Sequence, residues 1–486
     1  MKLNKIISKI SVLIMLLLLI ESPVVISYSV YHSLDNLVYD VCENKTREVI
    51  ISIAQYPRLS NCEELFGLIF NYSWIANDTL YKFTIRELTL DEVAGFGDKP
   101  LNTDNYDLLI VGANYNSYIR DCVNNKIRKN IKDFLSDGGG YIGSCAGATL
   151  ASMGFEKANG LFHRFANRGV LKIANVYSNE DWFGELQYCL RSVNYLPPIE
   201  VSVNKTTSNP IFKVYPDDSI NLTYGGGPGL YLANCSDPKL GEIVPLLTYS
   251  EDLMETKPIY WYIKGLLPGW IPIKKVKVDI LGQYCAVATT YNNSGKIVLY
   301  SSHAEIPLIV NGTLYERFGR PPTYASFGLV PRIVYDWVGT PMNMSHNWWI
   351  LRRTAAWIAG VPDEHLPPCN ELMVFMDKPA FRLGHYFYLN ETLSLLNPSS
   401  EIIQEILDWA GMTVIVGDIT IEAYAENSDF VEFYVDGVLE YTDHTHPFNW
   451  TLDRNNFNGL HRLELRAYDE YGSCARDGSE FYFINT

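Results

Sequence analysis

The sequence of 486 residues lacks the features of several large protein classes. It has no C-x-x-C pair and no Cys/His spacing of the kind that holds zinc, so no metal site is expected. No cluster of Lys and Arg follows the N-terminus, and the formal net charge of −16 argues against a nucleic-acid partner. The composition, 47% hydrophobic and 19% charged, is that of a folded chain. We therefore predict a globular protein with no metal, cofactor or nucleic acid.

Long apolar runs are also scarce, with a single one at Ile10–Ile20. Three lysines precede this run and Glu21 ends it, which is typical of a signal peptide or signal anchor within residues 1–30. Eleven residues are too few for a comfortable membrane span. Cleavage and N-terminal membrane anchoring both remain open, and either one predicts an extracellular or cell-surface protein.

Glycosylation sequons and cysteines agree with export. Eleven N-x-S/T sequons indicate a glycosylated surface, although an Asn-rich sequence also produces some by chance. In an oxidising compartment, eight of the nine cysteines can pair in disulfides and one is left over. The sequon asparagines are Asn44, Asn71, Asn77, Asn204, Asn221, Asn234, Asn292, Asn311, Asn343, Asn390 and Asn449. The cysteines are Cys42, Cys62, Cys122, Cys145, Cys189, Cys235, Cys285, Cys369 and Cys474.

Residues 45–362 have the pattern of an α/β domain. Short apolar segments such as "REVIISIAQY" predict strands, and they alternate with helical stretches such as "CEELFGLIF". In "NNKIRKNIKDFLSDGGG" the apolar residues follow helical spacing up to a glycine stop. Such alternation predicts a mostly parallel sheet covered by helices on both faces. An amphipathic helix within residues 344–362 closes the domain.

The remainder of the chain changes character. Residues 363–413 are predicted to form a linker that contains a short helix at "IIQEILDWAGM". Residues 414–486 alternate apolar and polar positions in short segments, with Asp436-Gly437 at a turn. This pattern predicts a small all-β sandwich.

One cysteine stands in an unusual setting. Cys145 lies in "GSCAG", between a predicted buried strand and a predicted helix, and this G-x-C-x-G pattern is typical of a nucleophile elbow. The N-terminus of the helix would stabilise a thiolate. The alternative is a packing cysteine in a glycine-rich turn.

A base and an orienting group come later in the chain. His303 and Glu305 stand two residues apart at the end of the predicted strand in "GKIVLYSSHAEIP". In an extended chain, residues i and i+2 point to the same face, so the carboxylate can lie beside the imidazole. A cysteine nucleophile, a histidine base and an orienting carboxylate form a catalytic triad.

Three segments, "GGGYIGSCAGA", "YGGGPGLYL" and "GKIVLYSSHAEIP", resemble the N-terminal domain of some biotin-protein ligases and of stand-alone relatives. The resemblance covers roughly residues 47–360 and implies the class I glutamine amidotransferase-like fold, a flavodoxin-like doubly wound sheet with Cys145, His303 and Glu305 as its triad. The segments "VEFYVDGVLEYT" and "HRLELRAYDEYG" resemble the immunoglobulin-like modules of microbial surface proteins. No "GRGRxGR"-type segment is present, so biotin ligase activity is not expected.

The sequence departs from this family at two places. Ala304 stands where family members often have proline, and the segment "VGANYNSY" replaces the usual Pro-Gly-Gly turn. Backbone N–H groups of Gly112, Ala113 and Ala146 are the candidates for the oxyanion site. In "GGGPG", Gly226 and Gly227 either line the substrate cleft or belong to a flexible loop.

These residues are compatible with two classes of function. The first is a cysteine-dependent amidase or peptidase that acts on a small-molecule or peptide substrate. Acyl transfer to another nucleophile would use the same triad, and an amidotransferase proper is disfavoured because no synthase domain is found in the chain. The second is a non-catalytic surface protein for binding or adhesion, whose C-terminal module contacts cell-surface partners.

Overall fold

A computed structural model describes most of the chain beyond residue 46. By contacts the chain divides into Met1–Lys45 and Thr46–Thr486, and every described element belongs to the second unit. The predicted signal segment and the predicted helix at 402–412 lie outside the described residues. Across the described ranges, no helix combines the length and apolarity needed to cross a membrane. These ranges are 47–57, 63–113, 121–122, 124–157, 161–179, 198–256, 260–264, 270–275, 278–309, 313–316, 335–338, 344–379, 387–389, 392–393, 413–453 and 457–484.

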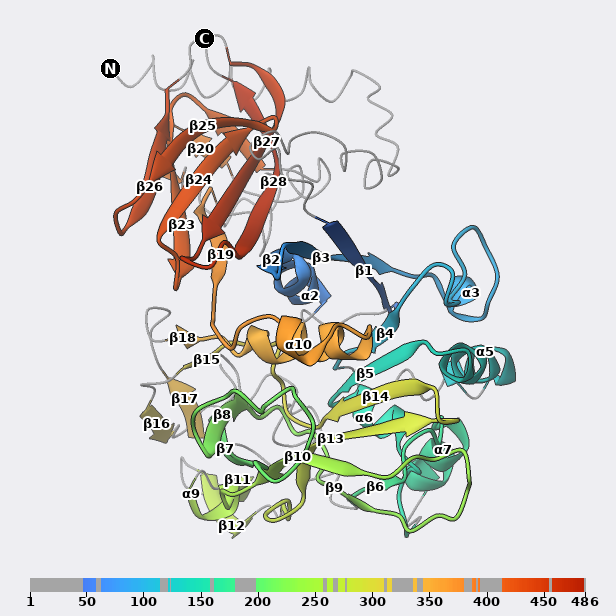
Figure 1. The fold of residues 1–486 in the computed structure, drawn as a ribbon. Helices are drawn as coiled ribbons and strands as arrows, with labels where there is room; N and C mark the ends of the chain where they lie inside the picture. The colour runs from blue at the N-terminus through green and yellow to red at the C-terminus, as the bar shows by residue number, and fades with distance from the viewer. Residues whose placement is uncertain are drawn as a thin grey trace, which may run out of the picture. The chain divides into compact units, whose positions relative to one another are not determined.

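The structure is mixed α/β, with one large sheet and more strands than helices (Figure 1). Five parallel strands form the centre of its N-terminal part, in the order β3-β1-β4-β5-β14. Their bounds are β1 (Arg47–Gln55), β3 (Thr79–Glu87), β4 (Leu108–Val111), β5 (Gly140–Ser144) and β14 (Gly295–Tyr300). The predicted parallel strands are therefore present in the described chain.

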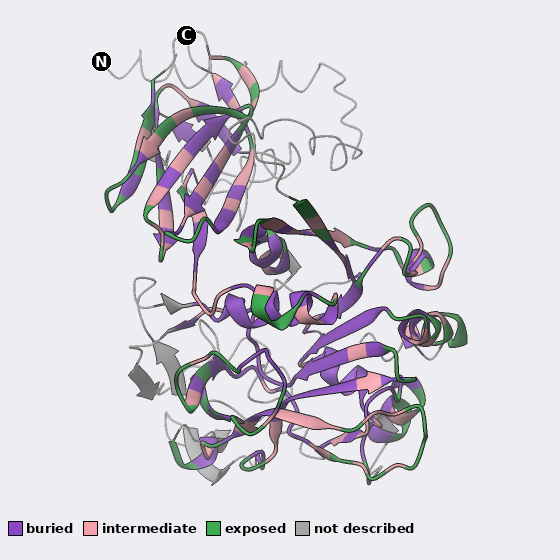
Figure 2. Cartoon of the chain, in the orientation of Figure 1, coloured by how far each residue is buried: buried purple, intermediate pink, exposed green. Residues whose placement is uncertain are grey.

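Helices cover both faces of these strands. Helices α2 (Glu63–Phe70) and α10 (Trp348–Ile358) pack in one buried cluster, while α5 (Asn125–Ser136) and α6 (Ala146–Ala151) pack in another. Neighbouring residues of one strand enter opposite clusters because strand side chains alternate. In β5, for example, Ile142 belongs to the α10 cluster and Tyr141 to the α5 cluster. Figure 2 shows β4 and β5 buried throughout, whereas the first residues of β1 are exposed.

Antiparallel strands extend the sheet on both sides, so the prediction of a mostly parallel sheet is wrong for the sheet as a whole. On one side β2 pairs with β3. On the other side the spatial order of the strands continues from β14 to β13, β10, β7 and β8. Strands β13 and β14 are joined by a short turn at residues 292–294, and such a connection produces an antiparallel pair. The bounds are β2 (Tyr72–Ala76), β6 (Val176–Ser178), β7 (Pro198–Val203), β8 (Ser219–Thr223), β9 (Leu230–Leu232), β10 (Val244–Tyr249) and β13 (Tyr284–Tyr291).

Smaller elements surround this sheet. The remaining helices are α3 (Leu90–Val93), α7 (Leu161–Gly169), α9 (Leu253–Thr256) and the 3₁₀ helix η3 (Asp363–His365). Three two-stranded sheets pair β11 (Tyr260–Lys264) with β12 (Trp270–Lys275), β15 (Leu308–Ile309) with β18 (Met344–Ser345), and β16 (Thr313–Glu316) with β17 (Tyr335–Val338).

The C-terminal strands form two sheets that share one apolar cluster. One sheet is β19-β23-β26. The strands β24, β25, β27, β28, β22, β20 and β21 belong to the large sheet, which they join through the pairing of β28 with β2. Strand β19 lies in the segment expected to be a linker, yet it pairs with β23. The turn at Asp436-Gly437 joins β24 to β25, as predicted. The bounds are β19 (Met373–Lys378), β20 (Phe387–Leu389), β21 (Thr392–Leu393), β22 (Thr413–Val416), β23 (Ile419–Glu426), β24 (Phe430–Val435), β25 (Val438–Asp443), β26 (Phe448–Leu452), β27 (Gly459–Tyr468) and β28 (Cys474–Ile484).

Candidate active site

Cys145 occupies the turn between β5 and α6 in a strained backbone conformation. Its φ is 50° and its ψ is −105°, a region that a residue with a side chain rarely adopts. The neighbouring glycines allow the turn to pack closely. A Cβ atom on Gly147 would lie 2.1 Å from the carbonyl oxygen of Val111, and one on Gly143 would lie 2.7 Å from the backbone of Gly147. The turn therefore has the small neighbours and sharp backbone of an elbow.

The end of β14 lies directly beside this turn. Ser144 and Tyr300 are register partners in the parallel pair β5–β14. The backbone N–H of Cys145 donates to the carbonyl oxygen of Tyr300 at 2.7 Å. The segment that comes after β14 is thereby held next to Cys145.

That segment carries His303 and Glu305. The Nδ1 atom of His303 lies 2.8 Å from Oε1 of Glu305, and the two residues are 3% and 0% exposed. The strand ends at Tyr300, so the pair does not share the face of a strand as the i, i+2 argument assumed. The contact is made instead across a bend, which the backbone N–H of His303 anchors by donating to the Thr223 carbonyl.

Two further residues hold Glu305 in place. The hydroxyl of Ser144 lies 2.9 Å from both carboxylate oxygens, and the indole N–H of Trp348 donates to the Glu305 carbonyl at 3.0 Å. A buried carboxylate needs such donors because it has left water. The G-x-C-x-G pattern does not single out Ser144, although it places a hydroxyl group at the end of the strand that precedes the nucleophile.

The electrostatics of the site favour a charged imidazole. Burial alone would lower the pKa of His303, but the Glu305 carboxylate and a hydrogen bond with Cys145 raise it well above its usual 6.5. The Glu305 carboxylate therefore favours the charged form of the imidazole. An imidazolium next to a cysteine favours the thiolate over the thiol.

Most of the other described cysteines are withdrawn from solvent. Burial raises the pKa of Cys122 to about 12, and it also raises the pKa values of Cys285, Cys369 and Cys474. All six described cysteines, these four with Cys145 and Cys235, are unpaired. The prediction of disulfides is therefore wrong for these six, several of which lie buried in the core as single thiols. In the described part of the chain, no three or more His, Cys, Asp or Glu side chains gather as they would around a metal ion.

The glycine-rich segment 225–229 packs against the segment that carries His303. A Cβ atom on Gly227 would lie 1.5 Å from the carbonyl oxygen of Ser301, and the Tyr224 hydroxyl donates to the Gly227 carbonyl at 3.0 Å. Gly226 is partly exposed, with a φ of 83°. This close packing argues against the flexible-loop alternative, and a role in substrate binding stays a prediction.

The predicted oxyanion residues come from two elements that meet. Gly112 and Ala113 come directly after β4, and the contact between Val111 and Gly147 brings the end of that strand to the start of α6. Ala146 is the first residue of α6, where backbone N–H groups have no partner within a helix. Their role in stabilising an oxyanion stays a prediction.

Comparisons with known proteins agree with part of this description. The family model "Biotin-protein ligase, N terminal" matches residues 98–315, a range that contains Cys145, His303 and Glu305. This match indicates a glutamine amidotransferase-like fold for that range. Comparison with curated proteins found no match.

Three solved structures show limited similarity. The fibronectin(III)-like modules of Clostridium thermocellum CbhA are 17% identical, with 24% of this chain and 99% of that chain covered and a TM-score of 0.16. A lytic polysaccharide monooxygenase of Jonesia denitrificans is 17% identical over 18% of this chain and 69% of its own, with a TM-score of 0.13. The protein SMU.1228c is 10% identical over 53% of this chain and 78% of its own, with a TM-score of 0.24.

Proposed function

We propose that this protein is a cysteine-dependent amide hydrolase, an amidase or peptidase, with Cys145, His303 and Glu305 as its triad. The proposal rests on His303, whose imidazole contacts the Glu305 carboxylate at 2.8 Å and hydrogen-bonds with Cys145. The strained turn at Cys145 supports it, since such turns present a nucleophile at the end of a strand.

In the proposed reaction the thiolate of Cys145 attacks the carbonyl carbon of an amide. The negative oxygen of the tetrahedral intermediate accepts hydrogen bonds from backbone N–H groups of Ala146 and of Gly112 or Ala113, worth about 3 kcal/mol for one well-aimed donor. His303 gives its proton to the leaving amine as the C–N bond breaks, which leaves a thioester. The neutral imidazole then takes a proton from water, which attacks the thioester and releases the acid and the thiolate.

We also propose a finer fold for each of the two parts of the chain. Residues 45–362 are a class I glutamine amidotransferase-like domain with a flavodoxin-like doubly wound sheet, supported by five parallel strands with helices on both faces. Residues 414–486 are an immunoglobulin-like sandwich, supported by two sheets that share one apolar cluster. We expect no biotin ligase activity.

We further propose that the chain is exported and glycosylated, either secreted or anchored through its N-terminal apolar segment. The described sequons support this, because six of their seven asparagines are exposed and the seventh, Asn204, is partly exposed. The six are Asn71, Asn77, Asn221, Asn234, Asn292 and Asn449.

Site-resolved alkylation tests the proposed nucleophile. The folded, non-reduced protein is treated with iodoacetamide at pH 6, and the modified cysteines are identified by mass spectrometry. Cys235 is the internal reference, since it is also a partly exposed, unpaired thiol. We expect Cys145 to react first, and His303→Gln to remove that preference because the imidazolium is lost.

An unreactive Cys145, or one that reacts no faster than Cys235, would contradict the proposal. That result would favour the alternative, a non-catalytic surface protein whose C-terminal module serves in binding or adhesion.

A further inference from the structure

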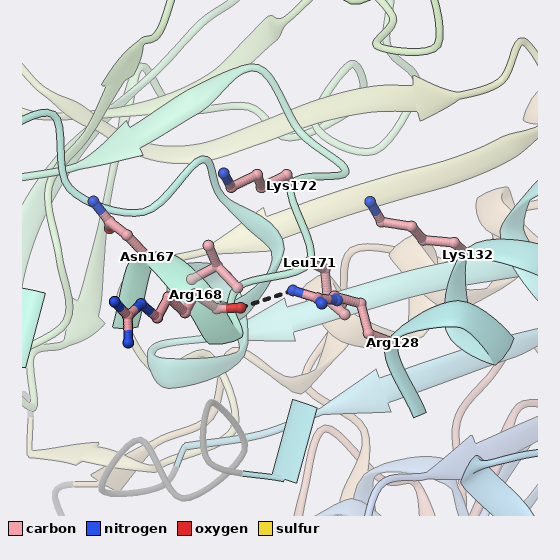
Figure 3. Close-up of a pocket in the computed structure, with 7 residues that line it drawn as sticks. Arg128, Lys132, Asn167, Arg168, Leu171 and Lys172 are labelled. Carbon is pink, nitrogen blue, oxygen red and sulfur yellow. Dashed lines mark hydrogen bonds between the residues drawn. The ribbon is translucent and has the colours of Figure 1, made fainter. Parts of the chain in front are cut away.

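A basic pocket lies away from Cys145, at the other end of α6. Its volume is about 490 Å³, and it is formed by α5, the end of α7 and the segment after α7. The backbone N–H groups of Leu171 and Lys172 donate to the carbonyl oxygens of Leu150 and Ser152. These hydrogen bonds connect the segment after α7 to the last turn of α6. Figure 3 shows the lining residues, which are Arg128, Lys132, Asn167, Arg168, Val170, Leu171 and Lys172.

Four of the seven lining residues are cations, in a chain whose net charge is −16. Within the described part of the chain, none of the four forms an ion pair with a carboxylate. Arg128 has neutral partners, the Arg168 carbonyl at 2.7 Å and the Asn125 side chain. By contrast, Lys129 on the same helix pairs with Asp133. The four cations of the pocket thus lack a carboxylate at ion-pair distance in the described chain, and Asp237, which raises the pKa of Lys132, offsets only part of their charge.

The local arrangement costs free energy in the absence of a ligand. Arg128 and Lys132 are four residues apart on α5, a spacing at which like charges repel. Burial is the largest cause that lowers the pKa of Lys132, and Arg128 is the next, with smaller contributions from Lys239 and Lys172, whereas the Asp237 carboxylate raises it. Lys172 itself has a φ of 56°, a left-handed backbone conformation that costs more free energy for lysine than for glycine or asparagine. A bound anion would offset this repulsion.

We propose that this pocket binds the phosphate group of a small molecule. The guanidinium of Arg128 is held in a fixed orientation by the Arg168 carbonyl, and a fixed guanidinium fork suits phosphate oxygens. Lys132 and Lys172 supply two further charges, which matches a dianion better than a single carboxylate. The volume lies within the range of ligand pockets, about 300 to 1,000 Å³, so there is room for more than the phosphate itself.

Titration calorimetry with pyrophosphate tests the proposal, at constant ionic strength maintained with sodium chloride. The pocket variant is the double substitution Arg128→Gln and Lys132→Gln. The matched control is Lys126→Gln and Lys129→Gln, which removes the same charge from the same helix outside the pocket lining. We expect saturable binding to the full-length protein, weakened about tenfold or more in the pocket variant. Binding to the control should stay within about twofold of the original, as for exposed charges.

Two results would overturn the proposal. One is the absence of saturable heat with pyrophosphate at matched ionic strength. The other is an equal loss of affinity in the control, which would mean unspecific attraction to α5. If the pocket variant does not fold, the single substitution Lys172→Gln replaces it, because the Lys172 side chain is exposed. We expect Lys172→Gln to weaken pyrophosphate binding about fivefold. An unchanged affinity in that variant would also contradict the proposal. Acetate, as a monoanion, should bind more weakly than pyrophosphate.

Discussion

At the scale of single residues, Glu305 connects the ends of two neighbouring strands. Its carboxylate accepts from Ser144 at the end of β5 and contacts His303 beyond the end of β14. A fully buried carboxylate is stable only where donors replace water. Glu305 therefore fixes both the orientation of the imidazole and its charge.

Removing the hydroxyl of Ser144 should be costly. In Ser144→Ala the buried carboxylate of Glu305 loses a donor, and we expect the free energy of unfolding to fall by about 1–3 kcal/mol at neutral pH. Urea denaturation measures this change. The control, Ser208→Ala at an exposed position between β7 and β8 and outside any sequon, should change stability by less than about 0.5 kcal/mol. Equal effects in the two variants would show that Ser144 does not hold Glu305.

The sequence was sufficient to predict some of these residues and not others. The elbow at Cys145 was visible because glycine and alanine surround one thiol between a strand and a helix. The contact of His303 with Glu305 was predicted from their spacing, although a bend rather than a strand produces it. The role of Ser144 was not predictable in this way, because Ser144 and Glu305 are 161 positions apart in the sequence and only the β5–β14 pairing brings them together.

At the scale of elements, the strongest sequence patterns gave the most accurate predictions. Helix α5 buries the four apolar residues that its spacing indicated, Ile127, Ile131, Phe134 and Leu135. Strand β2 was missed, although Asn77 and Asp78 form the turn that joins it to β3, with φ values of 48° and 58°. Asparagine and aspartate tolerate such angles, so the sequence did indicate a hairpin turn at this position. Strand β19 had no comparable signal, because its partner β23 lies far along the chain.

Replacing glycine with alanine should change the stability of the protein in opposite directions at two positions on different elements. Gly67 lies within helix α2 with nothing near its missing Cβ, so Gly67→Ala should stabilise the protein by about 1 kcal/mol. Gly227→Ala would place a Cβ atom 1.5 Å from the Ser301 carbonyl oxygen, and it should destabilise by at least about 3 kcal/mol. Thermal denaturation of both variants checks the signs. A neutral Gly227→Ala would mean that segment 225–229 does not pack beneath His303.

At the scale of the whole molecule, two buried clusters divide the described chain. The cluster around α5 and α6 is formed entirely from residues between 54 and 299. The other cluster continues into the C-terminal strands. The basic pocket also belongs to this scale, since its cations come from two segments, Arg128 with Lys132 on α5 and Arg168 with Lys172 at and after the end of α7. Only the fold brings the two segments together, which is why the sequence did not predict the pocket.

A chain that ends at Asn370 tests the independence of the first cluster. It keeps every residue of that cluster and loses the strands from β19 onward. We expect a lower melting temperature, because part of the second cluster is lost, with the preference of iodoacetamide for Cys145 over Cys235 retained. Loss of that preference in a folded truncated chain would show that the site depends on the C-terminal strands.

The most direct test of the central claim is the rate of Cys145 alkylation as a function of pH, compared between the original protein and Glu305→Gln. Glu305 raises the pKa of His303 against the effect of burial, so the variant should lose the imidazolium at a lower pH than the original protein. We predict that the original protein reacts faster at pH 6 by about tenfold or more, since one pKa unit corresponds to a factor of ten, and that the two converge in alkali. Equal rates at pH 6 would contradict the account, because Cys145 would then react without an imidazolium held by Glu305.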